Sequence, residues 1–304
     1  MTKKCLTLIA LLLVLIASAQ DYKTLTYFTN DTLKLELDLF VPEAAAKGKT
    51  PLVIYVHGGG FSGGDRNAGH SFCRAAAKEG YAAASISYSL YMKGKNFSCG
   101  GSLPEKIKAI QIAANQLQQS VVFFLNNASY NIDPGKIFIS GSSAGAETVL
   151  HAAFWDKKMM VMYPGKLPEG FRYAGVLSGA GAIMDINLIN KNTVVPVLLF
   201  HGSCDTTVPY GTAAHHYCPA DSSGWLMLFG SHSIFQQIGK LNGSTHLFTF
   251  CGGAHNYSNK LFEIGHQEII KFMNMTLTGR GDQSHTIIST GEKCTADDGY
   301  GLCE

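Results

Sequence analysis

Short apolar runs alternate with segments of helical spacing along most of this chain, and this alternation constrains its fold more than any other feature. The apolar runs cover residues 51–57, 81–90, 136–140, 173–179, 194–201 and 246–250. The segments with helical spacing cover residues 71–78, 103–126, 144–155 and about 259–275. Continuous apolar runs are typical of strands that are covered on both faces. The sequence therefore predicts an α/β fold, in which helices flank both faces of a mainly parallel sheet.

The ends of this alternating region have different patterns. Residues 32–42 alternate polar and apolar side chains with a period of two, which predicts an antiparallel edge strand. Residues 278–304 are rich in Gly, Asp, Ser and Thr, which predicts a polar, partly ordered C-terminal tail. No repeat or long linker interrupts residues 20–277, so we expect them to form one domain. A domain of this size can bury a substantial core.

The first 19 residues have the order of a secretory signal. Lys3 and Lys4 precede an apolar run over 5–17, and small residues at 17–19 offer a cleavage site. The run is too short for a membrane-spanning helix, which needs about 20 apolar residues, and no later stretch reaches that length. We therefore expect residues 1–19 to be a signal peptide and the mature protein to be secreted or periplasmic, with no membrane span.

The charge balance excludes whole classes of partner. Cleavage after residue 19 lowers the 24 basic groups to 22, equal to the 22 acidic ones. A nucleic-acid-binding protein needs a basic surface to neutralise phosphates, and an anionic membrane attracts basic segments. A formally neutral chain suits neither, so we expect an uncharged small-molecule or polysaccharide partner and no nucleic acid.

Seven cysteines remain after such a cleavage, an odd number that leaves at least one thiol outside any intramolecular disulfide. Cys73 lies in an expected helix and is predicted to be a buried free thiol. Cys294 and Cys303 are close in sequence, which suggests a small disulfide loop. Cys204 and Cys251 each follow a strand, and the sequence leaves open whether they form a disulfide or remain two buried thiols.

The pattern Gly141-Ser142-Ser143-Ala144-Gly145 stands between an expected strand and an expected helix. In a G-x-S-x-G turn the central serine is presented as a nucleophile, and the flanking glycines avoid collisions with neighbouring backbone. The alternative is an ordinary helix start with Ser143 as its N-cap. We predict that Ser143 is a nucleophile, and that Ser142 lies off the centre of the turn.

A second glycine-rich pattern, His57-Gly58-Gly59-Gly60-Phe61, ends the first buried strand. Successive glycines leave backbone N–H groups open to a substrate oxygen, as an oxyanion hole requires. We predict that the N–H groups of Gly59, Gly60 and Ala144 form such a hole; the alternative is a flexible glycine turn.

Asp205 and His255 follow the strands at 194–201 and 246–250. The chain order serine, aspartate, histidine is that of α/β-hydrolase triads, in which the imidazole takes the serine proton and the carboxylate orients the imidazole. Asp185 is the second choice for the acid. Other histidines are expected to be structural or to line a pocket: His201, His215, His216 and His232. The sequence predicts no metal site and no cofactor.

These residues together resemble α/β-hydrolase serine esterases over about residues 30–277. Four segments carry the resemblance: HGGGF (57–61), YNIDPGKIFISGSSAGA (130–146), HGSCDTTVP (201–209) and GAHNY (253–257). The chain is similar to carboxylesterases with an HGGG oxyanion motif, and especially to secreted bacterial esterases that remove feruloyl and acetyl groups from plant xylan. The resemblance implies an α/β-hydrolase fold for the catalytic domain 20–277. It also implies a triad of Ser143, Asp205 and His255.

Two departures separate the chain from related esterases. Ser142 stands where hormone-sensitive-lipase-type esterases carry an acidic residue, and Ser89 stands where relatives commonly carry arginine. The segment 210–245 is longer than the single helix usual there, and we expect an elaborated loop that borders the substrate pocket. Phe61, which ends the HGGGF segment, and Trp225, which lies in the segment 210–245, are predicted to contact substrate.

The sequence thus predicts a secreted carboxylic-ester hydrolase that works through an acyl-enzyme on small acyl or plant-polysaccharide esters. Three alternatives remain: a lipase, a serine peptidase on the same fold, and an inactive glycan-binding module.

Overall fold

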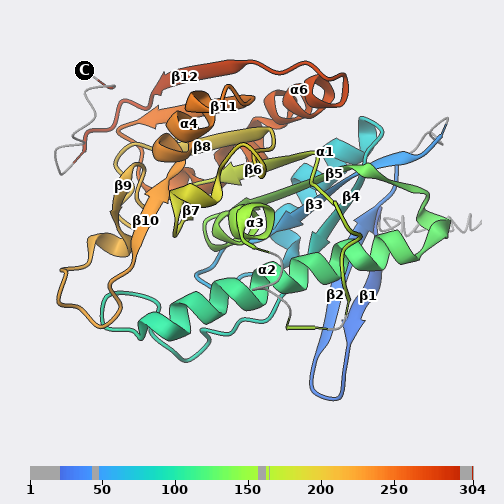
Figure 1. Cartoon of the computed structure of the whole chain (residues 1–304), viewed down its shortest axis with the longest axis horizontal. Helices are drawn as coiled ribbons and strands as arrows, with labels where there is room; N and C mark the ends of the chain where they lie inside the picture. Colours follow the sequence, from blue (N-terminus) through green and yellow to red (C-terminus); the bar gives the residue numbers. More distant parts are fainter. Residues whose placement is uncertain (1–20, 43–47, 157–161, 164, 295–302, 304) are drawn as a thin grey trace, which may run out of the picture.

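A nine-stranded sheet forms the centre of the computed structural model, which describes residues 21–42, 48–156, 162–163, 165–294 and 303. The expected signal peptide, 1–19, lies outside the described residues. In spatial order the strands are β1 (Lys23–Thr29), β2 (Lys34–Phe40), β4 (Ala82–Ile86), β3 (Thr50–Val56), β5 (Ile132–Ser142), β6 (Gly175–Gly179), β8 (Val197–Gly202), β11 (Thr245–Cys251) and β12 (Gln283–Ser289). All neighbours from β4 to β12 pair in parallel, whereas β1 and β2 are antiparallel additions (Figure 1). The strand predicted at 32–42 is β2, which is antiparallel as expected but lies between β1 and β4, so the prediction of an edge position is wrong and β1 forms the edge.

Strand β3 shows why continuous apolar runs form the middle of this sheet. Leu52, Ile54 and Val56 belong to the core cluster on one face, and Val53 and Tyr55 belong to the cluster on the other. Successive side chains of a strand point to opposite faces, so a strand covered on both sides needs apolar residues at every position.

Helices cover both faces of the sheet, which confirms the predicted fold class. The helices of one face are α2 (Leu103–Asn126), α3 (Ala144–Phe154) and α4 (Ser231–Lys240). Those of the other are α1 (His70–Lys78), α5 (Lys260–Ile264) and α6 (His266–Leu277). The two groups contribute their apolar side chains to different core clusters. The helix expected at 259–275 is divided at Gly265, where a Cβ would lie 2.4 Å from a Leu261 methyl carbon.

A second, three-stranded sheet lies beside the carboxyl ends of the main strands. Its order is β7 (Ala182–Ile183), β10 (Met227–Gly230) and β9 (Thr212–Ala214), paired antiparallel. The segment 210–245, expected to be an elaborated loop, supplies β9, the short helix η5 (His215–Tyr217), β10 and α4. This segment therefore contains regular structure as well as loop.

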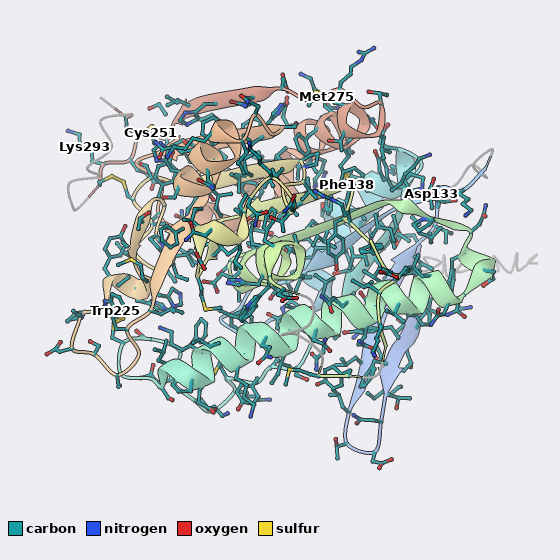
Figure 2. The ribbon with its side chains drawn as sticks, in the orientation of Figure 1. Asp133, Phe138, Trp225, Cys251, Met275 and Lys293 are labelled. Carbon is teal, nitrogen blue, oxygen red and sulfur yellow. A yellow bond between two sulfur atoms is a disulfide. The ribbon has the colours of Figure 1, made fainter. Side chains whose placement is uncertain are left out.

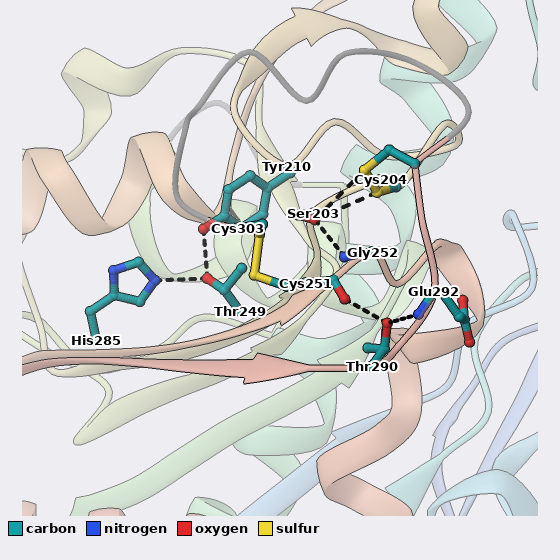
Figure 3. Close-up of a disulfide and its surroundings, with 11 residues drawn as sticks. Ser203, Cys204, Tyr210, Thr249, Cys251, Gly252, His285, Thr290, Glu292 and Cys303 are labelled. Atoms are coloured by element: carbon teal, nitrogen blue, oxygen red, sulfur yellow. Dashed lines mark hydrogen bonds between the residues drawn. A yellow bond between two sulfur atoms is a disulfide. The ribbon is translucent and has the colours of Figure 1, made fainter.

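The C-terminal region is tied to the sheet by pairing and by disulfides. Strand β12, within the segment whose composition suggests a polar tail, pairs with β11 over seven positions. The disulfides are Cys99–Cys218, Cys204–Cys294 and Cys251–Cys303. The suggested Cys294–Cys303 loop is therefore wrong, and so are both possibilities left open for Cys204 and Cys251, a disulfide between them or two buried thiols. Cys204 follows β8 and Cys251 ends the neighbouring β11, but each bonds to a cysteine of the segment after β12 (Figure 3). Cys73 is buried and free, which confirms that prediction.

Among the residues that the structure describes, no helix combines the length and apolarity that a membrane crossing needs.

Candidate active site

Ser143 lies on a sharp turn between β5 and α3. Its backbone has φ 53° and ψ −123°, a region that non-glycine residues rarely occupy. A Cβ on Gly145 would lie 2.0 Å from the carbonyl oxygen of Val56, and one on Gly141 would lie 2.4 Å from Gly145. Both flanking positions of the G-x-S-x-G pattern therefore need glycine: Gly145 because the turn packs directly on β3, and Gly141 because the turn folds back on its own backbone.

Three side chains that are far apart in sequence meet at this turn. The Ser143 Oγ lies 2.7 Å from Nε2 of His255, and Nδ1 of His255 lies 2.6 Å from Oδ2 of Asp205. Asp205 follows β8 and His255 follows β11, and these strands are parallel neighbours. Ser143 holds the N-cap position of α3, but its hydroxyl makes no capping bond and faces the imidazole instead. The structure thus brings together all three residues of the predicted triad.

Asp205 is buried, and its two carboxylate oxygens have separate partners. Oδ1 accepts backbone N–H groups from Thr207 at 2.8 Å and Val208 at 3.0 Å. Oδ2 faces His255 and also Nε2 of His201, at 3.2 Å. Burial by itself raises the pKa of Asp205, but the hydrogen bonds from His201 and His255 outweigh burial and hold that pKa well below its ordinary value. Asp205 is therefore a carboxylate at neutral pH.

His201 is a second hydrogen-bond partner of Asp205. Its Nε2 faces two acceptors, Oδ2 of Asp205 and the Val208 carbonyl oxygen at 3.1 Å, so the proton of a neutral ring belongs on this nitrogen. Nδ1 then accepts the Ser231 hydroxyl at 2.9 Å. The sequence places His201 among structural histidines, and its position four residues before Asp205 is the only signal of this contact.

The glycine-rich loop after β3 packs against the serine turn. A Cβ on Gly58 would lie 3.2 Å from Cβ of Ser143, and one on Gly59 would lie 2.3 Å from the Gly63 carbonyl oxygen. Gly59 and Gly60 have φ of 111° and 59°, which favour glycine. Their backbone N–H groups donate to no acceptor in the described part of the chain.

A cavity of about 1000 Å³ opens over these residues. Its lining includes all three glycines of the loop, Ser143, Ala144 and His255, and it also includes Phe97, Glu147 and His215. The predicted oxyanion-hole residues Gly59, Gly60 and Ala144 thus share one cavity with Ser143.

The two predicted substrate contacts lie elsewhere. Phe61 is fully buried and packs edge-on against Tyr88 and Phe97, outside the cavity lining. Trp225 lies on the loop before β10, also outside the lining (Figure 2). Phe97 lines the cavity instead, from the loop before α2, where no sequence pattern marks it.

Within the described ranges, no group of three His, Cys, Asp or Glu side chains is placed to hold a metal ion.

Comparison with known proteins gives the fold an independent test. A thermophilic esterase (Est2) from the planctomycete Thermogutta terrifontis superimposes with a TM-score of 0.59, at 14% identity over 85% of this chain and 92% of that protein. Its propionate-bound form gives a TM-score of 0.58 at 15% identity, over 85% of this chain and 94% of that one. The fold is that of the α/β-hydrolases. The same esterase phosphorylated by paraoxon gives a TM-score of 0.53 at 16% identity, over 84% of this chain and 91% of that one.

Sequence comparison points the same way over a shorter span. Residues 37–162 match the BD-FAE family model, an esterase family. The matched span contains Gly59, Gly60 and Ser143, and it ends before Asp205 and His255. No curated protein matches the sequence. The predicted resemblance to α/β-hydrolase serine esterases is confirmed.

Proposed function

We propose that this protein is a serine carboxylic-ester hydrolase with Ser143 as nucleophile, His255 as base and Asp205 as the acid of the triad. One observation carries the proposal: Ser143 Oγ lies 2.7 Å from His255, which lies 2.6 Å from the buried Asp205. Ser143 and His255 line a cavity together with Gly59 and Gly60, whose N–H groups donate to no acceptor among the described residues. Nucleophile and base within hydrogen-bonding reach, with a third group orienting the base, are the arrangement that activates a serine.

The geometry supports an acyl-enzyme mechanism. Asp205 accepts a hydrogen bond from Nδ1–H of His255, which leaves Nε2 unprotonated and able to take the proton of Ser143 as the serine oxygen attacks the ester carbonyl. The N–H groups of Gly59, Gly60 and Ala144 would stabilise the resulting oxyanion. The alcohol then leaves with the proton from His255. A water molecule, deprotonated by the same imidazole, releases the acid and restores the serine.

The compartment and substrate of this reaction follow from other features. Three disulfides are typical of proteins from oxidising compartments, and the N-terminal segment has the order of a secretory signal. We propose that the enzyme is secreted or periplasmic and acts on small acyl or plant-polysaccharide esters, including acetyl and feruloyl esters. The cavity and the formally neutral mature chain suit an uncharged ester.

The variant S143A tests the proposal with p-nitrophenyl acetate as substrate. We expect kcat to fall by about 10⁴-fold or more, because the nucleophile is gone. The matched control is S142A, which removes the neighbouring hydroxyl and should retain most of the activity. Equal activity of S143A and wild type would refute the assignment.

A covalent label gives a second test. The Thermogutta esterase is found phosphorylated by paraoxon. We expect paraoxon to inactivate this protein and to leave a diethyl phosphate on the peptide that contains Ser143, as measured by mass spectrometry. Labelling of another serine with Ser143 unmodified would contradict the proposal.

A further inference from the structure

Glu147 is a carboxyl group buried in the wall of the active-site cavity. It lies one helical turn after Ser143 in α3, and helical side chains lean toward the N-terminus, so its carboxyl group reaches back toward the serine turn. The residue is 1% exposed. Its Oε1 has no hydrogen-bond partner among the described residues. A helix-start glutamate usually faces water, where it stabilises the helix dipole, so this burial calls for another explanation.

His215, from η5, is the second unpartnered group in the same wall. It is 1% exposed, it lines the cavity, and its Nδ1 has no hydrogen-bond partner in the described part of the chain. Its Nε2 lies 3.8 Å from Oε1 of Glu147, too far for a hydrogen bond. The Phe97 ring packs edge-on against the imidazole, with centroids 5.1 Å apart. The two polar groups therefore stand side by side next to an aromatic wall.

The charges around this pair define what it can bind. Burial raises the pKa of Glu147 to about 8, so its carboxyl keeps a proton at neutral pH. Burial also holds the pKa of His215 well below its ordinary value, so the imidazole is neutral. Lys106 is buried nearby, where its ammonium donates to the Gly224 carbonyl oxygen at 2.7 Å. Lys106 does not line the cavity and both groups of the pair are neutral, so a neutral group that donates and accepts hydrogen bonds suits them better than an ion.

We propose that Glu147 and His215 form a hydroxyl-binding subsite of the cavity, which selects esters with a hydroxyl group on the ring of the acyl or of the alcohol part. This inference rests on the proposed esterase function. A hydroxyl is both donor and acceptor, so it can accept from the protonated carboxyl and donate to an imidazole nitrogen. Phe97 supplies an apolar surface for the ring. A buried polar group without a hydrogen-bond partner is rare in proteins and costs free energy. A substrate that supplies the missing partner removes this cost and therefore binds more tightly.

The test compares matched ester pairs that differ only in ring hydroxyls. One pair is methyl para-hydroxycinnamate and methyl cinnamate, for the acyl side; the other is a monoacetylated methyl xyloside and the same ester without its two free ring hydroxyls, for the alcohol side. The readout is the ratio of kcat/KM for the hydroxylated ester to that for its partner. In E147M, an apolar side chain of similar length, we expect this ratio to fall roughly tenfold for the pair whose hydroxyl reaches the subsite.

Two further variants separate binding from structure. E147Q keeps a neutral donor and acceptor in the same shape, so the ratio should stay within about threefold of wild type. E268M changes an exposed glutamate of α6 in the same way and should leave the ratio unaltered. The pair that responds to E147M identifies whether the hydroxyl belongs to a phenolic acyl group or to a sugar.

Three results would overturn the inference. An unchanged ratio in E147M for both pairs would mean that no substrate hydroxyl contacts Glu147 and His215, and that these groups bind only water. An equal fall for all four esters in E147M and E147Q would show a structural role alone. A ratio that falls as much in E268M would also exclude the subsite. Failure of the esterase proposal itself looks different, because S143A would then retain activity on every ester.

Discussion

Replacement of Asp205 by asparagine should abolish most activity because the carboxylate is held in one orientation. Oδ1 accepts the N–H groups of Thr207 and Val208, so in D205N the amide oxygen must take that place. The amide NH₂ then occupies the Oδ2 position, 2.6 Å from Nδ1 of His255. Nδ1 must accept, and the ring proton moves to Nε2, which faces Ser143. In that tautomer the imidazole cannot take the serine proton.

The magnitude follows from the loss of this proton transfer. The equivalent change in a chymotrypsin-type protease lowers kcat by about 10⁴, which corresponds to about 5.5 kcal/mol. Folding should be affected far less. The new NH₂ also faces Nε2–H of His201, but that proton can bond entirely to the Val208 carbonyl oxygen at 3.1 Å. We expect the free energy of unfolding to fall by about 1–3 kcal/mol, the effect of one weakened buried hydrogen bond.

Steady-state hydrolysis of p-nitrophenyl acetate measures the effect, with thermal unfolding as a check on folding. D185N is the matched control, since Asp185 is the other candidate acid in the sequence and is exposed. Its Oδ1 accepts the N–H of Asn187 at 2.9 Å at the start of a short helix, and the residue is not part of the cavity lining. We expect D185N to stay within about twofold of wild type, because the amide oxygen of asparagine can make the same capping bond. A folded D205N within about tenfold of wild type would refute this tautomer argument.

Three further predictions concern the loop, the disulfides and the buried acid. G59A introduces a Cβ 2.3 Å from a carbonyl oxygen at φ 111°, and the displaced oxyanion loop should lower kcat by about 10²–10³-fold in the same assay. C294S removes the disulfide to Cys204 and should lower the free energy of unfolding by about 2–4 kcal/mol, as measured by urea titration. Thiol counting in denaturant should then find two free thiols, Cys204 and Cys73, whereas the mature wild type should have one. Glu147 has a pKa raised by burial from 4.5 to about 8, so the folded state keeps a proton that the unfolded chain releases, and stability falls as pH rises through this window. E147Q should therefore be more stable than wild type at pH 8 and lose that advantage near pH 4, as urea titrations at both pH values would show.

The sheet and the serine turn could be predicted because their signals are local. Strand β3 is apolar at successive positions since both of its faces are covered. The turn at Ser143 needs glycine on one side because β3 passes so close, and on the other because the turn folds tightly on itself. Asp205 and His255 were placed by chain order and by their positions after strands. Parallel strands end at the same edge of a sheet, which brings such residues together.

Strand β12 could not be predicted, because almost nothing in its sequence distinguishes it from a loop. It pairs on one side only, with β11, and most of its side chains are exposed or half-buried. An edge strand of this kind needs few apolar residues, so QSHTIIS resembles the polar segments around it. The wrong disulfide assignments have the same origin. The partners of Cys204 and Cys251 depend on the path of the chain after β12.

Part of the cavity wall could not be predicted, for a different reason. Phe97 and Glu147 come from a loop and a helix, and neither belongs to a recognisable motif, whereas His215 is among the histidines expected to be structural or to line a pocket. Phe61 adjoins the glycine motif in sequence, yet it points into the core because the loop turns at Gly59 and Gly60. Proximity to a motif along the chain therefore does not determine which side chains reach the site.

The segment after β12 has a clear relation to the proposed chemistry. Two backbone N–H groups link the loops that carry Asp205 and His255. The N–H of Cys204 donates a hydrogen bond to the Gly253 carbonyl oxygen at 2.9 Å. The N–H of Gly252 donates to Oγ of Ser203 at 3.0 Å (Figure 3). Each loop is also bonded covalently to the C-terminal segment, one residue before Asp205 and four residues before His255. Because a misplacement of about 1 Å can cost 10²-fold in rate, these ties serve the alignment of acid and base as well as stability. An oxidising compartment would then be a condition for full activity, and not only for folding.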